Sequence, residues 1–316
     1  MRVTQIAILE EFAVCLVISD HSLISYPLQA ILPVSDSEPP VDNIRRAPQR
    51  ISTNVTYFTT AKMKDRTLIF YKRKEGSHTT FKVLEPLYPR VSEKRNRFFG
   101  TRRTPEVYRD YDEFFIPSEC YSLSIFQTYI GVATPRGFEM LTLDKKQPVS
   151  IPDLRDPAMA SIADRIRDQR PLQMFRLNDN EFILAYEKCA VYVDKHGDIS
   201  RSFVMEYIGQ HKGVTSATMH GRYLLLSTPD YVEVRNAESG ELCQVIVGED
   251  VRIIDPGVSG AVGGNDPISQ TQTEDSVDEL LSMGGGSKST VKISMSHPVQ
   301  RGRQLVLEML LKDEHI

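Results

Sequence analysis

The feature that most constrains the fold of this chain is a degenerate repeat of about 40 residues, built from short apolar strands and tight turns. Its clearest copies begin near Val3, Val55, Tyr121, Leu172 and Val214. The middle strand of each copy is the most apolar, and these strands are Phe12–Ile18, Thr67–Tyr71, Ile130–Thr134, Phe182–Tyr186 and Tyr223–Ser227. Repeated sets of short strands at this spacing predict an all-β fold of radial or stacked sheets.

The alternation of polar and apolar residues separates a β-propeller from a two-layer sandwich. The later strand Tyr231–Asn236 (YVEVRN) alternates, whereas Phe12–Ile18 (FAVCLVI) is apolar throughout. A blade packed between two neighbours buries both faces of its inner strands and leaves its outer strand half exposed. The pattern therefore favours a β-propeller over a sandwich. The chain has no Trp, which disfavours the WD40 subtype with its Trp-Asp signature.

Two segments interrupt the repeat within what we expect to be one domain, residues 1–316. Residues 85–112 are rich in Arg and Lys and form a predicted basic insertion loop. Residues 255–289 are rich in Gly, Ser, Asp and Gln, a composition typical of a flexible loop. That second loop splits a sixth copy into Val251–Ile254 and Thr290–Leu311. Pro157–Arg167 has spacing that suits a short helix.

Composition indicates an ordinary globular chain. Apolar residues make up 41% of the 316 residues, and the net charge is only −4, so overall charge does not favour nucleic acid or membrane binding. No run of about 18 apolar residues predicts a transmembrane helix. The N-terminus reaches an acidic pair too early for a secretory signal. Four widely spaced cysteines indicate reduced core thiols and hence a cytoplasmic protein.

The sequence contains no motif for catalysis, cofactors or metals. Its seven His residues are scattered without HxH or HExxH spacing, and no cysteine forms a CxxC pair. Nucleophile-elbow, Walker and GxGxxG patterns do not occur. The acids Asp110, Asp112 and Glu113 read as a solvated cluster at a strand end. A propeller enzyme would need convergent acids, His or metal ligands, and the sequence offers none, so we predict no enzyme activity and no cofactor.

The basic loop is the candidate site for a partner. Its cationic and aromatic side chains are Arg90, Lys94, Arg95, Arg97, Phe98, Phe99, Arg102 and Arg103. Arg and aromatic residues are enriched at protein interfaces, and basic clusters with apolar residues also bind anionic lipid head groups. Three interpretations stay open: a solvated loop, a site for a protein or acidic peptide, and a lipid site. The acidic remainder of the chain argues against nucleic acid.

Several segments together resemble the citron homology domain. They include VTQIAILEEFAVCLVISDHSLISYPL near the N-terminus, FRLNDNEFILAYEKCAVYVDKHGDISR in the middle and YVEVRNAESGELCQVIVGEDVRII after it. The version most similar is that of fungal Rho guanine-nucleotide exchange factors of the cell-wall-integrity pathway. The resemblance implies a seven-bladed propeller without an active site, and a parent protein whose exchange and lipid-binding modules lie outside this sequence.

The count of five clear copies and a split sixth falls short of seven. Either strands of an N-terminal blade are missing, or the ring closes in a way that the repeat does not reveal. The resemblance implies a regulatory, protein-interaction domain of a Rho exchange factor, with a Rho-type GTPase or another signalling protein as its partner and no small-molecule substrate. The alternative is a peripheral module that binds anionic membranes through the basic loop, recruited from the cytoplasm to the plasma-membrane cortex.

Overall fold

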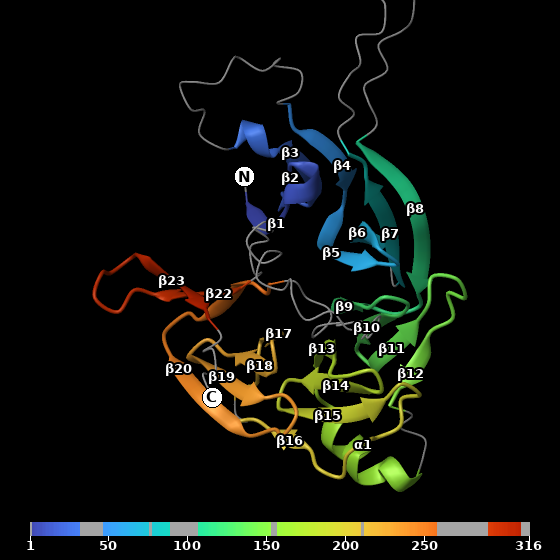
Figure 1. Ribbon diagram of the computed structural model, residues 1–316, viewed down its shortest axis with the longest axis vertical. Helices are drawn as coiled ribbons and strands as arrows, with labels where there is room; N and C mark the ends of the chain where they lie inside the picture. The colour runs from blue at the N-terminus through green and yellow to red at the C-terminus, as the bar shows by residue number, and fades with distance from the viewer. Residues whose placement is uncertain are drawn as a thin grey trace, which may run out of the picture. The chain divides into compact units, whose positions relative to one another are not determined.

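The computed structural model describes residues 2–31, 47–75, 78–88, 107–152, 157–209, 212–257 and 290–310. Within them, strands form six antiparallel sheets in chain order (Figure 1). Five sheets have four strands and the last has three, which matches the five clear copies and the split sixth. The fold is therefore a β-propeller, as the repeat predicts.

The first three sheets come from the N-terminal half. Sheet 1 consists of β1 (Val3–Leu9), β2 (Val14–Ser19), β3 (Ser22–Pro27) and β4 (Gln49–Thr53). Sheet 2 consists of β5 (Val55–Met63), β6 (Arg66–Glu75), β7 (His78–Pro86) and β8 (Tyr108–Ile116). Sheet 3 consists of β9 (Ser122–Ile125), β10 (Ile130–Thr134), β11 (Gly137–Leu141) and β12 (Val149–Ile151).

The predicted helix follows sheet 3, as a 3-10 turn at Pro157–Met159 that continues into α1 (Ala160–Ile166). Sheet 4 then consists of β13 (Pro171–Arg176), β14 (Glu181–Tyr186), β15 (Cys189–Asp194) and β16 (Met205–Glu206). Sheet 5 consists of β17 (Ser216–His220), β18 (Tyr223–Ser227), β19 (Tyr231–Asn236) and β20 (Leu242–Val247). Sheet 6 consists of β21 (Arg252–Asp255), β22 (Val291–Ser296) and β23 (Gln304–Met309).

The turns follow from local backbone preferences. Asp20 and His21 join β2 to β3 with positive φ angles of 47° and 59°. Lys64 and Asp65 join β5 to β6 in the same way, with φ angles of 49° and 59°. Two-residue hairpin loops with both residues at positive φ match the right-handed twist of the flanking strands. These turns fix the register of both hairpins.

The predicted middle strands are the buried ones. All residues of β2 and β10 are buried, as expected for strands covered on both faces. Each of the first four sheets also has a fourth strand that the apolar pattern does not reveal. β8 is charged along its length and β16 has only two residues, so neither shows apolar alternation.

The chain divides into two compact units, residues 1–130 with 141–149 and residues 131–140 with 150–316. In the first unit, sheets 1 and 2 pack face to face, with Leu16, Leu23, Phe58 and Ile69 almost fully buried between them. In the second unit, sheets 4 and 5 enclose an equivalent core. Its central side chains are Phe175, Ile183, Tyr192, Leu224 and Leu226. Sheets 5 and 6 pack in turn through Leu225, Val232, Val291 and Ile293.

Candidate functional site

The predicted basic loop connects β7 to β8, the third and fourth strands of sheet 2. Its eight candidate residues, Arg90 through Arg103, lie outside the described residues. The structure does describe both ends of the loop, because β7 runs to Pro86 and β8 begins at Tyr108. The geometry of these ends therefore defines the base from which the candidate residues depart.

Three contacts hold the base of the loop in place. The Leu87 N–H donates a hydrogen bond to the Val107 carbonyl over 2.8 Å, which extends the β7–β8 ladder by one step. The Tyr88 ring lies 4.8 Å from the Phe12 ring, measured between centroids. The hydroxyls of Tyr108 and Ser25 form a hydrogen bond from sheet 2 to sheet 1. The two ends of the loop are thus anchored on sheets 1 and 2.

Charge at the base is balanced by one carboxylate. Glu85 accepts hydrogen bonds from Arg66 over 3.0 Å and from Nε of Arg109 over 3.1 Å. Burial alone would raise the pKa of Glu85, but the hydrogen bonds and charges of Arg109 and Arg66 outweigh burial and lower it. Glu85 therefore stays ionised and ties β7 to β6 and β8.

Lys72 lies on β6, next to the strand β7 from which the loop departs. Its ammonium group donates to the Cys120 carbonyl over 2.7 Å, so the charge is directed at the backbone. Two of the three acids predicted to form a solvated cluster, Asp112 and Glu113, have separate partners. Asp112 pairs with Lys146, and Glu113 lies 3.5 Å from Lys82. Asp112 and Glu113 each face their own cation, which is unlike the convergent pair needed for acid–base catalysis.

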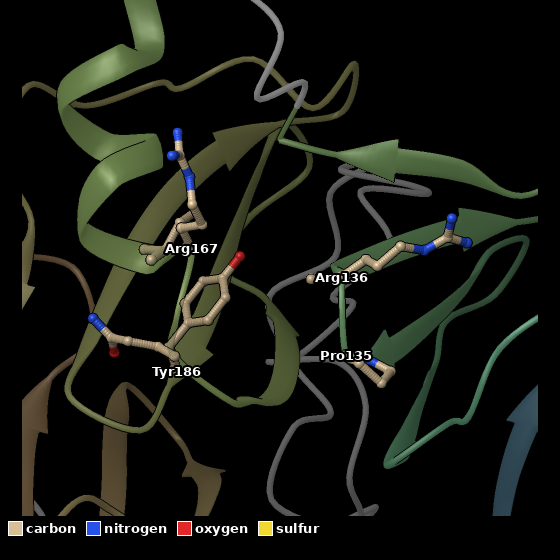
Figure 2. A pocket seen from close by; sticks show the side chains of 7 residues that line it. Pro135, Arg136, Arg167 and Tyr186 are labelled. Atoms are coloured by element: carbon tan, nitrogen blue, oxygen red, sulfur yellow. The ribbon is translucent and has the colours of Figure 1, made fainter.

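A second site lies in the other unit, in a cavity of about 310 Å³. Its walls are the β10–β11 turn, with Pro135 and Arg136, and the segment after α1, with Arg167 (Figure 2). Tyr186, the last residue of β14, forms its floor. Figure 2 shows the Tyr186 hydroxyl directed into the space between Arg167 and the β10–β11 turn.

Side-chain contacts fix the floor and one wall of this cavity. The Tyr186 ring meets Phe138 edge-on at a centroid distance of 5.3 Å, and only 1% of Tyr186 is exposed. Burial raises the pKa of the Tyr186 hydroxyl far above its ordinary value, so the hydroxyl keeps its proton. The Gln169 amide donates to the Arg165 carbonyl over 2.6 Å and accepts from the Lys188 N–H over 2.9 Å. Gln169 is therefore a structural wall of the cavity.

The cysteine prediction is only partly right. Cys15, Cys120 and Cys189 are buried free thiols, whereas Cys243 is exposed. Cys243 lies on β20, the outer strand of sheet 5, where five of the six residues are exposed, because only β19 covers one edge of this strand. Within the described ranges no group of three or more His, Cys, Asp or Glu side chains could hold a metal ion. The described helix is also too short and polar to cross a membrane.

Comparison with known proteins identifies the family. The CNH domain family matches residues 1–257 of the sequence. The chain belongs to the CNH domain family. A solved structure of the AfRom2 CNH domain aligns with a TM-score of 0.69 at 20% identity, covering 98% of this chain and 81% of that one. The citron homology resemblance and the propeller fold are both confirmed.

The relatives of this CNH domain are Rho exchange factors. The chain is 28% identical over 260 residues to Rho1 guanine nucleotide exchange factor 3 of Schizosaccharomyces pombe, covering 79% of this chain and 20% of that protein. It is 27% identical over 262 residues to Rho1 guanine nucleotide exchange factor 1 of the same organism, covering 81% and 19%. The chain thus spans about a fifth of the length of these relatives. No sequence motif joins the residues that line the cavity at Tyr186, so the sequence alone does not reveal this site.

Proposed function

We propose that this CNH domain is a non-catalytic regulatory module of a Rho guanine-nucleotide exchange factor and binds a Rho-type GTPase. Family membership and the names of the relatives support the association with Rho exchange factors. The described residues form sheets without convergent catalytic groups, which suits a binding platform. By the same association, the module acts in cell-wall integrity, in the cytoplasm and at the plasma-membrane cortex.

One observation carries the choice of surface, namely the anchored base of the basic loop. Tyr88 and Val107 leave sheet 2 at neighbouring points, held by backbone pairing and by ring contact with sheet 1. A fixed base reduces the conformational entropy that a charged segment loses on binding. Tyr88 is 67% exposed and adds an aromatic side chain beside the cationic segment. Aromatic and Arg side chains dominate the binding energy of protein interfaces.

The test is a binding measurement between the purified chain and a Rho-type GTPase, loaded in turn with GDP and a GTP analogue. Charge reversal of Arg95, Arg97, Arg102 and Arg103 to Glu should abolish measurable binding, because like charges would then face an acidic partner. The matched control reverses four exposed cations elsewhere, Lys145, Lys195, Arg301 and Arg303, and should bind normally. Equal loss in both variants would mean that net charge, rather than this loop, is responsible.

A second candidate function is binding to anionic membranes. The exposed Tyr88 beside a segment that contains Phe98, Phe99 and several cations has the composition of a lipid-contacting loop. Sedimentation with phosphatidylserine vesicles tests it. If the wild-type chain sediments with these vesicles and ignores the GTPase in either nucleotide state, the membrane function replaces the first proposal.

A further inference from the structure

The cavity above Tyr186 is lined by a hydrogen-bond donor that the fold does not use. Among the described residues, the Tyr186 hydroxyl has no hydrogen-bond partner, although only 1% of the residue is exposed. The hydroxyl oxygen itself is not among the fully buried polar atoms of the described residues, so it opens on the cavity, where a ligand can reach it. By contrast, the hydroxyl of Tyr192 on β15 donates to the Ala237 carbonyl over 2.8 Å. Tyr186 is instead aimed into open space (Figure 2).

The charged side chains that line the cavity are both cationic. Arg136 forms an ion pair with Glu139 at 3.3 Å, and Arg167 forms one with Asp164 at 3.1 Å. Both guanidinium groups are at the rim, with 68% and 67% of their side chains exposed. Each guanidinium has five N–H donors, and one carboxylate leaves several of them for another acceptor. A neutral donor at the floor and two cations at the rim select an acceptor with negative charge.

We infer that this cavity binds the carboxylate of an Asp or Glu side chain from an acidic segment of a partner protein. One carboxylate oxygen would accept from the Tyr186 hydroxyl. The exposed guanidinium groups of Arg136 and Arg167, which point away from that hydroxyl in Figure 2, would turn inward toward the other oxygen. Pro135 and the Tyr186 ring supply apolar walls for the aliphatic part of the side chain. A volume of about 310 Å³ is at the small end for ligand pockets, which suits a side chain rather than a large cofactor.

A carboxylate fits this cavity better than a phosphate group. A phosphate group presents three strongly accepting oxygens and close to two charges, which call for several convergent donors. The cavity floor offers one hydroxyl, because the Gln169 amide is already bonded to the Arg165 and Lys188 backbones. The inference rests on the proposed function only in assuming that the domain binds proteins. It involves residues of the second unit alone and none of the basic loop.

The experiment uses the full chain labelled with 3-fluorotyrosine and followed by ¹⁹F NMR. The resonance missing from the Tyr186→Phe variant is that of Tyr186. It should shift when an acetylated hexaglutamate peptide is added and stay in place with hexaglutamine. In fluorescence anisotropy with fluorescein-labelled hexaglutamate, Tyr186→Phe should weaken binding roughly tenfold, because a hydrogen bond to a charged group is lost.

Matched variants separate the cavity from general electrostatics. The double variant Arg136→Gln, Arg167→Gln should weaken hexaglutamate binding at least as much as Tyr186→Phe. Arg176→Gln should leave hexaglutamate binding unchanged. Arg176 pairs with Asp179, three residues away as in the two cavity pairs, but it does not line the cavity. Thermal unfolding of each variant shows whether it is folded, and Tyr186→Phe removes only a hydroxyl that has no partner.

Two results would overturn the inference. One is a Tyr186 resonance that hexaglutamate does not move, or an affinity that Tyr186→Phe does not change. The other is a resonance that inorganic phosphate shifts and hexaglutamate does not, which would assign the site to phosphate. No GTPase is present in these assays. Failure of the chain to bind a Rho-type GTPase would therefore leave a positive peptide result intact. Failure of the chain to bind hexaglutamate would likewise leave a positive GTPase result intact.

Discussion

The ion pair between Glu181 on β14 and Arg201, in the segment between β15 and β16, provides a quantitative test of what a largely buried charge pair contributes to stability. Arg201 donates to both carboxylate oxygens of Glu181, over 3.0 Å from Nε and 2.8 Å from Nη2. The guanidinium also lies 4.3 Å from the centre of the Tyr192 ring and donates to the Glu238 carbonyl. Only 18% of the Arg201 side chain and 20% of the Glu181 side chain are exposed.

The pKa of Glu181 gives the size of the effect. Hydrogen bonding by Arg201, opposed by burial and helped by Ser200 and Asn178, lowers this pKa from 4.5 to about 2. That difference sets an upper bound of roughly 3 kcal/mol. Residual solvent contact screens the pair, which reduces the expected value to about 2 kcal/mol. Because the folded pKa is depressed, the stabilisation is complete above about pH 5 and is lost as the pH falls toward 2.

The assay is urea unfolding of the wild type and of Glu181→Gln at several pH values. At pH 7 the variant should be less stable by about 2 kcal/mol, and at pH 3 the difference should fall below half of that. A double-mutant cycle with Arg201→Gln should show a coupling energy of about 1–2 kcal/mol. The exposed pair Arg176–Asp179 is the control, with an expected coupling near zero. A difference between wild type and variant that is the same at both pH values would refute the reasoning.

Two further predictions test turn geometry and thiol exposure. Gly197→Ala should lower the free energy of unfolding by about 3 kcal/mol, because φ is +90° and the new Cβ would lie 2.4 Å from Cγ2 of Ile151. Gly302→Ala, with φ of +79° and no atom within 4 Å, should cost only about 1 kcal/mol in the same urea titration, and equal losses would contradict the packing argument. In a thiol assay with Ellman's reagent, Cys243 alone should react quickly in the folded chain, because burial raises the pKa of Cys189 to about 11 and Cys15 and Cys120 are buried. Cys243→Ser should remove the fast phase, and a fast phase that persists would show that a buried thiol is accessible.

The order and number of the sheets could be predicted because their middle strands carry a strong signal. A strand such as β10, buried at all five positions, carries small or apolar residues except at Thr134, whose hydroxyl donates to the Gly137 carbonyl over 3.1 Å. The outer strands lack this constraint. β8 reads YRDYDEFFI, and its charged residues merge with the basic segment before it, so the sequence hides a nine-residue strand. The hairpin turns at Asp20-His21 and Lys64-Asp65 contain no Gly, and only the backbone angles reveal their type.

The two candidate sites differ in how far the sequence can predict them. The basic loop is contiguous, so a cluster of Arg and Lys indicates it without any knowledge of the fold. The cavity combines Arg136, Arg167 and Tyr186, three residues separated by 50 positions in the chain and joined by no motif. The available signal is the tyrosine at the end of the apolar strand β14, which is equally typical of a core residue. Only tertiary packing shows that its hydroxyl is unused.

Both candidate sites lie where strands end, and this placement follows from how a propeller uses its residues. Along a middle strand, the backbone groups are paired on both sides and most side chains fill the core, so few groups face a partner. The described β7–β8 pairing ends at Leu87 and Val107, and at the β10–β11 turn Pro135 and Arg136 line the cavity. Substitutions along the ladders should therefore change stability, and substitutions at the strand ends should change binding. Tyr186 is the exception that joins the two roles, because its ring packs on Phe138 while its hydroxyl faces the cavity. Replacing Tyr186 by Phe should separate them, leaving stability unchanged and reducing only the affinity for an acidic peptide.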